Sequence, residues 1–391
     1  MLRFKLIMIV DCYMLKGGVT ILQFVFWLIG GIVIAFLIRA IGDLMLQRKK
    51  KKTNPEYITR FIKEKLNSGN VSLSIRHNDQ TWIDINPNKL LPLASTVKII
   101  IAIEYAKQAA EGQIDPNKKV KLKELNNFYI PKTDGGAHEE WIKHWKRNDI
   151  DSVPLYEVAN GMIAYSSNAN TEYLIEVLGL QNINRVPKSL GILNHDPMYP
   201  TASALYIPTQ LINEKIGLSK QEILKMMKEM DMAEYRRRAI DIHNKWVKQP
   251  LSNQEKKQLL KTLDMDFQKI WSDRLPHSTT RDYVSIMNKL NGKTYFKKEV
   301  YKYLDPVMEQ LMKNPKNREW LTHAGQKGGS TAFVLTSAMY ATDKEQNKTE
   351  IVFFSNELTR LEQKKVIQNL NEFQLQFLKD EKFRVEVKGS I

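Results

Sequence analysis

The chain has 391 residues, and 59 lysines and arginines against 43 aspartates and glutamates give it a formal charge of +16. Its single cysteine, Cys12, excludes a disulfide framework and a cysteine metal site. The positive charge favours an anionic environment, but no nucleic-acid recognition motif accompanies it, so we expect no nucleic-acid partner.

The first 54 residues have the pattern of a membrane anchor. Val19–Ile38 reads VTILQFVFWLIGGIVIAFLI, in which only Thr20 and Gln23 are polar. A helix of this length spans about 30 Å, the thickness of a bilayer core. No small-residue cleavage site follows, which favours an uncleaved single-pass helix over a removed signal peptide. The basic run Arg48–Lys52 then forms a juxtamembrane segment.

The charges around this anchor leave its topology open. The positive-inside rule applied to Arg48–Lys52 would keep the larger domain in the cytoplasm. Long domains, however, translocate largely regardless of charge, and such a run also suits anionic headgroups on the outside. The topology therefore has to be inferred from the chemistry of the domain.

Residues 55–391 predict one α/β domain of the α+β type. Two alternating runs joined by Asn78-Asp79-Gln80 indicate an antiparallel hairpin, and helical patterns dominate from Ser95 to about Leu290. Strand patterns return at 330–342 and 349–358, and an amphipathic helix over 359–380 follows them. We expect an antiparallel sheet built from both ends of the domain and flanked by helices, a helical subdomain, and an active site in the cleft between them.

One segment has the composition of an insertion. Residues 213–268 are rich in lysine, glutamate and methionine. This composition predicts a charged helical pair on the outside of the domain, away from the chemistry.

A hydroxyl and an amine open the most apolar helix. Ser95-Thr-Val-Lys98 precedes a run of isoleucine and alanine. Residues three apart share one helix face, so the Lys98 amine is expected to reach the Ser95 hydroxyl. An apolar environment lowers the pKa of an ammonium and makes a neutral lysine available as a base. A serine with a base beside it is an activated nucleophile, although a serine in this place is more often a plain helix cap.

Two further motifs follow in order along the chain. Ser166-Ser167-Asn168 stands in a loop before a helix, and Lys327-Gly328-Gly329 runs into a strand. S-x-x-K, S-x-N and a K-T-G-like triplet are the motif set of class A β-lactamases and penicillin-binding proteins. From about Glu56 to the C-terminus, the chain thus resembles the serine β-lactamase and penicillin-binding protein superfamily, and its class A branch in particular.

The resemblance implies a role for each motif residue. Ser95 attacks the carbonyl and forms an acyl-enzyme, and Lys98 takes its proton. Ser166 passes a proton to the leaving nitrogen with help from Lys327, which also attracts a substrate carboxylate. The backbone N–H groups of Ser95 and Ser330 form the oxyanion hole. The implied substrate-binding residues are Asn168, Gly329, Ser330 and Thr331.

The chain departs from the class A pattern in three places. Ser167 stands where an aspartate is usual, and Gly328 removes a hydroxyl near the substrate carboxylate. The third departure concerns the loop glutamate that activates the deacylating water in an E-x-x-L-N pattern, because Leu190 occupies that position. Asp196 is the only carboxylate of residues 186–208 and is the candidate replacement.

Two other patterns resemble functional motifs but do not belong to this set. His138 and His144 are six residues apart and fall on different helix faces, so they do not form a zinc motif. We expect neither a metal nor another cofactor. Lys132–Gly136 mimics K-T-G but comes too early in the chain, and it is interpreted as a loop over the cleft.

The sequence therefore predicts a membrane-anchored serine hydrolase that acts through an acyl-enzyme on β-lactams or related cell-wall amides and esters. A D,D-peptidase or a wall-polymer esterase is the alternative among enzymes. A penicillin-binding receptor or a non-catalytic wall-binding module is the alternative from another class, and turnover separates it from the enzymes. Because such substrates are met outside the membrane, the catalytic domain is expected to be extracellular.

Overall fold

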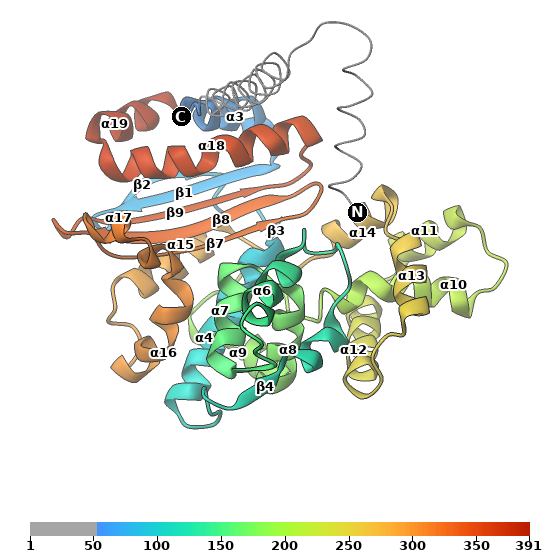
Figure 1. Cartoon of the computed structure of the whole chain (residues 1–391). Coiled ribbons are helices and arrows are strands. Elements are labelled where there is room, and N and C mark those ends of the chain that lie inside the picture. Colours follow the sequence, from blue (N-terminus) through green and yellow to red (C-terminus); the bar gives the residue numbers. More distant parts are fainter. Residues whose placement is uncertain (1–52) are drawn as a thin grey trace, which may run out of the picture. The chain divides into compact units, whose positions relative to one another are not determined.

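The computed structural model describes residues 53–391 (Figure 1). Pro55–Ile391 form one unit with its own core. The predicted membrane helix over Val19–Ile38 and the basic run Arg48–Lys52 lie outside the described residues. Within residues 53–391, no helix has both the length and the apolarity that crossing a bilayer requires.

A five-stranded antiparallel sheet in the order β2-β1-β9-β8-β7 forms the centre of the fold. The first strand pairs with the last, with Val71 opposite Ser355. This pairing confirms the predicted sheet built from both ends of the domain. The strands are β1 (Val71–His77), β2 (Gln80–Ile85), β7 (Leu321–Ser330), β8 (Leu335–Asp343) and β9 (Lys348–Ser355).

The strand predicted over 330–342 is wrong at its beginning, because a turn interrupts it. The Thr331 N–H donates to the Val334 carbonyl at 3.0 Å, and the Thr331 hydroxyl accepts from the N–H groups of Phe333 and Val334, each at 3.1 Å. The chain before this turn forms β7, and the Lys327-Gly328-Gly329 triplet lies inside that strand, at the edge of the sheet.

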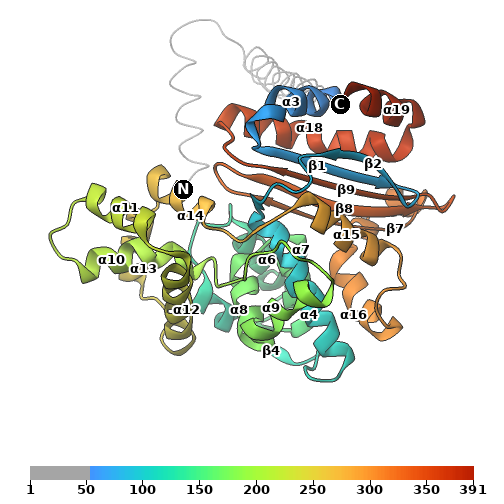
Figure 2. The same cartoon turned by 180° about the vertical axis from the view of Figure 1, so that it is seen from behind.

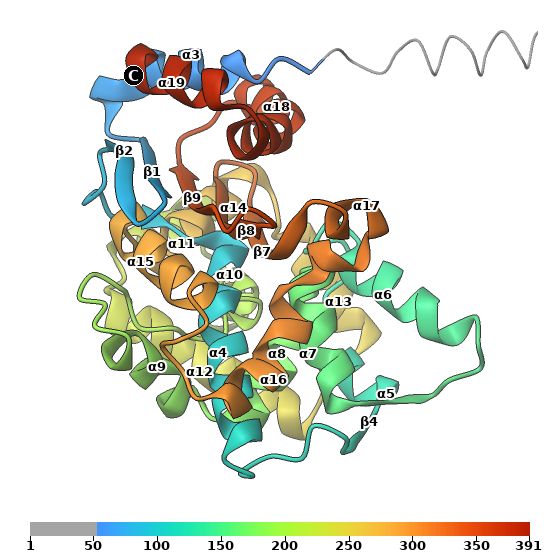
Figure 3. The same ribbon diagram turned by 90° about the vertical axis from the view of Figure 1, so that its left-hand side faces the viewer.

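Three helices cover one face of the sheet (Figures 1 and 3). Helix α18 matches the predicted 359–380 helix, whereas the short helix after it was not predicted. A capping box starts α18, because the Thr359 hydroxyl accepts from the Glu362 N–H at 3.2 Å and the Glu362 carboxylate accepts from the Thr359 N–H at 2.8 Å. The helices are α3 (Glu56–Lys65), α18 (Arg360–Lys379) and α19 (Glu381–Ser390).

The opposite face carries the helical lobe, with the buried helix α4 at its centre (Figure 2). Short strand pairs, β3 (Leu91–Pro92) with β6 (His277–Ser278) and β4 (Lys119–Lys121) with β5 (Ser152–Pro154), join its loops. The helices are α4 (Lys98–Ala110), α5 (Leu122–Leu125), α6 (Ala137–Lys146), α7 (Leu155–Ala164), α8 (Asn168–Leu178), α9 (Leu180–Ser189), α15 (Thr280–Asn291), α16 (Lys298–Met308) and α17 (Pro315–Arg318).

The segment predicted as a charged helical pair is larger and less peripheral than expected. Its helices extend to one side of the molecule in Figures 1 and 2, but their inner faces share a buried cluster with Phe128, Ala169 and Tyr199. Lysine and glutamate side chains of these helices are mostly on the solvent side, which gives the helices an amphipathic pattern that overall composition does not show. The helices are α10 (Ile207–Glu214), α11 (Lys220–Glu229), α12 (Met232–Lys248), α13 (Asn253–Lys261) and α14 (Met265–Asp273).

Candidate active site

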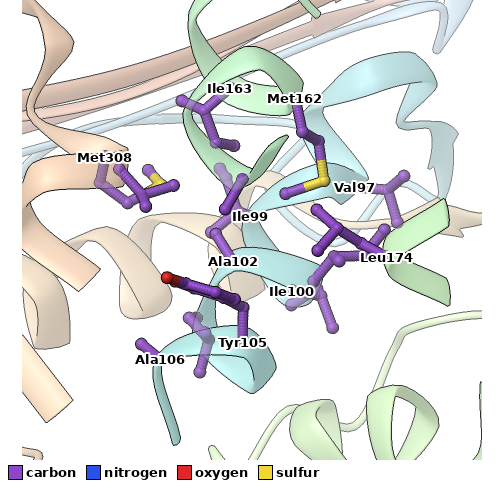
Figure 4. Close-up of a cluster of buried hydrophobic side chains, with 14 of the residues drawn as sticks. Val97, Ile99, Ile100, Ala102, Tyr105, Ala106, Met162, Ile163, Leu174 and Met308 are labelled. Carbon is purple, nitrogen blue, oxygen red and sulfur yellow. The ribbon is translucent and has the colours of Figure 1, made fainter. Parts of the chain in front are cut away.

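The predicted nucleophile lies on a rigid support. Ser95 belongs to the 3₁₀ turn η2 (Ala94–Val97), which leads directly into α4, and the Lys98 N–H donates to the Ser95 carbonyl. Helices α7, α8 and α16 enclose α4, so the turn cannot move without repacking of the core (Figure 4). The enclosing side chains labelled in Figure 4 are Met162, Ile163, Leu174 and Met308.

The Lys98 side-chain nitrogen is buried and has three hydrogen-bond partners. It lies 2.7 Å from the Ser166 carbonyl oxygen, 3.3 Å from the Ser166 hydroxyl and 2.9 Å from the Asn168 side-chain oxygen. The described chain shows no hydrogen bond from Lys98 to the Ser95 hydroxyl, contrary to the direct contact that helix spacing predicts. Burial, followed by the charge of Lys327, holds the pKa of Lys98 well below its usual range.

Ser166 occupies the centre of the site. Its hydroxyl lies 3.0 Å from the Lys327 ammonium and 3.3 Å from the Lys98 ammonium, so it bridges the two amines. Its backbone has φ 68°, in the left-handed region that costs a non-glycine residue free energy. The bond from Lys98 to the Ser166 carbonyl helps to hold this strained conformation, which is typical of functional sites.

Lys327 approaches from the edge strand β7. Its side chain is buried and donates to the Ser166 hydroxyl and, at 2.7 Å, to the Gly328 carbonyl. Burial lowers the pKa of Lys327 to about 7, so the amine changes charge near neutral pH. A lysine in this state can give or take a proton near neutral pH.

Gly329 brings strand β7 against the Ser95 turn. A Cβ at this position would lie 2.5 Å from the Ser95 nitrogen and 2.8 Å from the Leu93 carbonyl, so only glycine fits. The Thr336 hydroxyl on the neighbouring strand also donates to the Leu93 carbonyl at 2.9 Å. The backbone of Ser95 thus lies next to Gly329, one residue before Ser330, the other predicted oxyanion donor.

The Lys132–Gly136 loop is part of the site. The Asp134 carboxylate accepts from the N–H of His138 at 3.1 Å and from the N–H of Asn168 at 3.4 Å. It therefore ties the loop to the S-x-N turn. Sequence reasoning placed a loop here but missed the carboxylate, whose only signal was an acidic residue inside the K-T-D-G-G decoy.

Ser167 replaces the usual aspartate with a different set of contacts. Its hydroxyl accepts from the Asn170 N–H at 3.2 Å, which caps α8, and contacts the His138 Nδ1 at 2.9 Å. Burial lowers the pKa of His138 to about 4, so this imidazole is neutral at physiological pH. The middle residue of the motif is therefore structural, as a helix cap.

These residues surround a cavity of about 560 Å³. Strand β7, the η2 turn, the S-x-N turn and the 133–135 loop form most of its wall. Helices α14 and α18 also contribute to the wall, and the sequence did not predict their part in the site. The lining residues from these two helices are Gln268, Trp271, Ile367, Leu370 and Asn371.

Thr331 and Asp196 have different positions relative to this cavity. Thr331 lines it, but its hydroxyl also bonds the Ser272 hydroxyl at 2.6 Å and organises the β7–β8 turn. Asp196 is not among the lining residues, and its carboxylate accepts from the His277 N–H at 3.1 Å and lies 3.8 Å from Arg236. The His277 side chain, whose Nδ1 lies 3.3 Å from the same carboxylate, is the main cause that lowers the pKa of Asp196 and makes it a weaker base.

Within residues 53–391, no three histidine, cysteine, aspartate or glutamate side chains are grouped so that they could hold a metal ion.

The antiparallel sheet, the helical lobe and the cleft between them are the architecture of a serine β-lactamase-like protein. Residues 55–370 match the model of the Beta-lactamase enzyme family, and the chain belongs to that family. No curated protein matches the chain.

Several solved structures are similar to this chain in fold. A class A β-lactamase from Bacteroides cellulosilyticus has 16% identity, with 87% of this chain and 99% of that chain covered and a TM-score of 0.48. A β-lactamase from Chitinophaga pinensis has 15% identity, with 77% and 91% covered and a TM-score of 0.46. PBP-A has 14% identity, with 83% and 100% covered and a TM-score of 0.42.

Proposed function

We propose that this chain is a serine hydrolase that forms an acyl-enzyme on Ser95 with β-lactams or related cell-wall amides and esters. The observation that carries the proposal is the Ser166 hydroxyl between the side-chain nitrogens of Lys98 and Lys327, beside the Ser95 turn. Such an arrangement provides a nucleophile, a base and a path for the proton to the leaving group.

In this proposal the Ser95 oxygen attacks the carbonyl carbon while Lys98, as the neutral amine, takes the hydroxyl proton. The N–H groups of Ser95 and Ser330 stabilise the oxyanion. When the bond to the leaving nitrogen or oxygen breaks, the proton passes through Ser166 to the leaving atom. Asn168 hydrogen-bonds the acyl side chain of the substrate. The low pKa of Lys98 supports its role as the base, because an uncharged amine is required.

The test is covalent labelling followed by intact mass. Ser95→Ala should abolish labelling by a fluorescent penicillin, and Lys98→Ala should slow it by about 10²- to 10⁴-fold, the usual contribution of a general base. Ser68→Ala, an exposed serine outside the cavity, is the control and should label normally. Labelling of Ser95→Ala at the normal rate would overturn the assignment.

The fate of the acyl-enzyme distinguishes the candidate functions. Leu190 occupies the place of the loop glutamate, and Asp196 is bound to His277 and Arg236 away from the cavity lining. Because Leu190 holds the position of that glutamate and Asp196 is engaged outside the cavity lining, we expect penicillins to acylate Ser95 and to leave slowly. This expectation favours a peptidase or esterase, or a penicillin-binding receptor, over an efficient β-lactamase.

Burst kinetics with a chromogenic cephalosporin measure this step. We expect one fast equivalent of product followed by a slow steady state, unchanged in Asp196→Asn. Rapid turnover that is lost in Asp196→Asn would mean instead that Asp196 replaces the glutamate. If turnover is slow with β-lactams, release of product from peptides or esters then separates an enzyme from a receptor.

The membrane anchor over Val19–Ile38 is part of the proposal, with the catalytic domain on the extracellular side. Its support is the length and apolarity of this segment in the sequence, together with the place where wall substrates are met. Protease treatment of intact cells should remove residues 55–391. Protection of the domain until the cells are lysed would contradict this topology.

A further inference from the structure

One acidic side chain lies in the wall of the cavity. Asp134, in the loop before α6, is half-buried and is the only carboxylate among the cavity-lining residues of the described chain. The other ionisable lining side chain there is Lys98, whose pKa burial holds well below its usual range, as a neutral base requires. Asp134 is therefore the charged group that the cavity wall presents directly to a ligand.

The surrounding backbone holds this carboxylate in place. Its Oδ1 accepts from the Gly136 N–H at 3.2 Å, and its Oδ2 accepts from the His138 N–H at 3.1 Å and from the Asn168 N–H at 3.4 Å. Gly135 and Gly136, with φ values of 67° and 87°, turn the chain here in the left-handed region. The Asp134 side chain is thus fixed relative to the S-x-N turn.

These contacts leave the negative charge of Asp134 without a cationic partner. A carboxylate has about four acceptor positions, and the three N–H groups occupy three of them. Within residues 53–391, no lysine, arginine or histidine forms an ion pair with it. Asp196, by contrast, lies 3.8 Å from Arg236 and 3.3 Å from His277. A carboxylate with a free acceptor position in a cavity wall and no cationic partner favours a ligand that brings a cation.

The contacts of Asp134 place it beside the acyl part of a substrate in the proposed mechanism. There the leaving atom lies next to the Ser166 hydroxyl, which Lys327 contacts, and the acyl side chain bonds Asn168. Asp134 is bonded to Asn168 itself. Burial and the charge of Lys327 lower the pKa of Lys98, whereas the charge of Asp134 raises it, so the field of this carboxylate reaches the reacting centre.

We propose that Asp134 selects substrates whose acyl side chain carries a positively charged group, an ammonium in particular, and disfavours substrates with an anion there. This inference rests on the proposed acyl transfer. The bond from Ser95 Oγ to the acyl carbon forms, the bond from that carbon to the leaving nitrogen or oxygen breaks, and the Ser95 proton ends on the leaving atom. The ammonium takes no part in these steps, but its ion pair with Asp134 orients the acyl group and determines specificity.

Three penicillins that differ at one carbon of the acyl side chain are the matched probes. Penicillin G is uncharged at this carbon, ampicillin has an amino group and carbenicillin has a carboxylate. The acylation rate constants of the purified full-length chain are measured by intact mass at about pH 6, below the usual pKa of an α-amino group, so that ampicillin carries its positive charge. In the wild type, the rate constant should decrease in the order ampicillin, penicillin G, carbenicillin.

Asp134→Asn keeps the shape and an acceptor oxygen for the backbone but removes the charge. The rate ratio of ampicillin to penicillin G should fall about tenfold, the usual effect of one hydrogen bond to a charged group, and the ratio of carbenicillin to penicillin G should rise. A change in the pKa of Lys98 affects all three penicillins equally and cancels in these ratios. Glu140→Gln is the matched control, because it removes the same charge from an exposed position on α6 outside the cavity lining.

The outcomes separate this inference from the proposed function. Acylation of Ser95 with both ratios unchanged in Asp134→Asn overturns the inference and leaves the proposed function standing. Equal changes in Asp134→Asn and Glu140→Gln also overturn it, because the net charge of the molecule would then set the ratios. A wild-type preference for carbenicillin over ampicillin overturns it without any variant, so the test holds even if Asp134→Asn does not fold. If no penicillin acylates Ser95, the proposed function and this inference fail together.

Discussion

The buried amines of Lys98 and Lys327 determine how the site responds to pH. Burial lowers the pKa of both groups, and the charge of Lys327 lowers that of Lys98 further. Acylation needs a neutral Lys98, so its rate should rise with pH through the pKa of Lys98. It should fall again as Lys327 loses its proton near its pKa of about 7. The two groups interact, so the profile reports apparent values for the pair.

Two substitutions separate these contributions. Lys327→Met removes a positive charge near Lys98, which should raise the pKa of Lys98 and move the rising limb to higher pH. Lys327→Arg keeps the charge, because arginine does not deprotonate. The pH–rate profile of this variant should therefore have no falling limb. The measurement is the acylation rate constant with penicillin G across pH. An unchanged rising limb in Lys327→Met would contradict the coupling between the two amines.

At the scale of elements, a buried ion pair joins the 213–268 helices to the helix that begins with Asn168. Glu172 on α8 is buried and accepts from the Ser203 hydroxyl at 2.9 Å and from the Ala202 N–H at 2.8 Å. His243 on α12 lies 2.7 Å from the same carboxylate. The outer helices are therefore bound to the helix that positions the S-x-N motif.

Removing His243 should destabilise the fold strongly. His243→Leu leaves the Glu172 charge without its cationic partner, a loss typically worth about 3–5 kcal/mol. Arg237→Ala on the same helix is the control, since its ion pairs are exposed and worth about 0–1 kcal/mol. Urea unfolding measures both. Similar losses in the two variants would show that Glu172 does not depend on His243.

The pair should also make stability depend on pH. Burial lowers the pKa of His243, but the bonds to Glu172 and Glu176 outweigh it and raise the pKa above its ordinary value. The stabilisation is therefore complete below the unfolded pKa of about 6.5 and is lost as pH rises through the higher folded pKa. In His243→Leu, the free energy of unfolding should not fall over this pH range.

At the scale of the whole molecule, segments from the two ends of the domain pair in the sheet and pack together on one of its faces. Strand β1 pairs with β9, and α19 packs near α3 in the cluster that covers that face. Phe383 of α19 is buried there, whereas Val385 on the same helix is 59% exposed. The short helix after α18 thus completes the core and is not a solvated tail.

Substitutions on this helix should therefore differ. Phe383→Ala should lower the free energy of unfolding by about 3–5 kcal/mol, the usual cost of removing a buried phenylalanine. Val385→Ala should change it by no more than about 0.5 kcal/mol. Thermal and urea unfolding of the full chain give both values. A small effect of Phe383→Ala would mean that α19 is not part of the cooperative unit.

The sequence by itself determined the local parts of the site. The motif order, the apolar helix after Ser95 and the capped helix over 359–380 depend on residues close together in the chain, which hydrophobic periodicity and spacing reveal. The sequence placed Lys327-Gly328-Gly329 against a strand but did not predict β7 as a separate strand, because its three glycines interrupt the alternation of a half-buried strand.

Only the tertiary structure decided which groups meet. The Ser166 hydroxyl lies between two lysines that are separated by more than 200 residues in the sequence. The Asp134 carboxylate accepts from the Asn168 N–H, although two helices separate these residues along the chain. In the folded chain, Asp196 does not line the cavity, whereas Trp271 and Ile367 do. Spacing along the chain predicts neighbours on one helix face, whereas contacts between elements depend on how their buried faces pack, which no local pattern encodes.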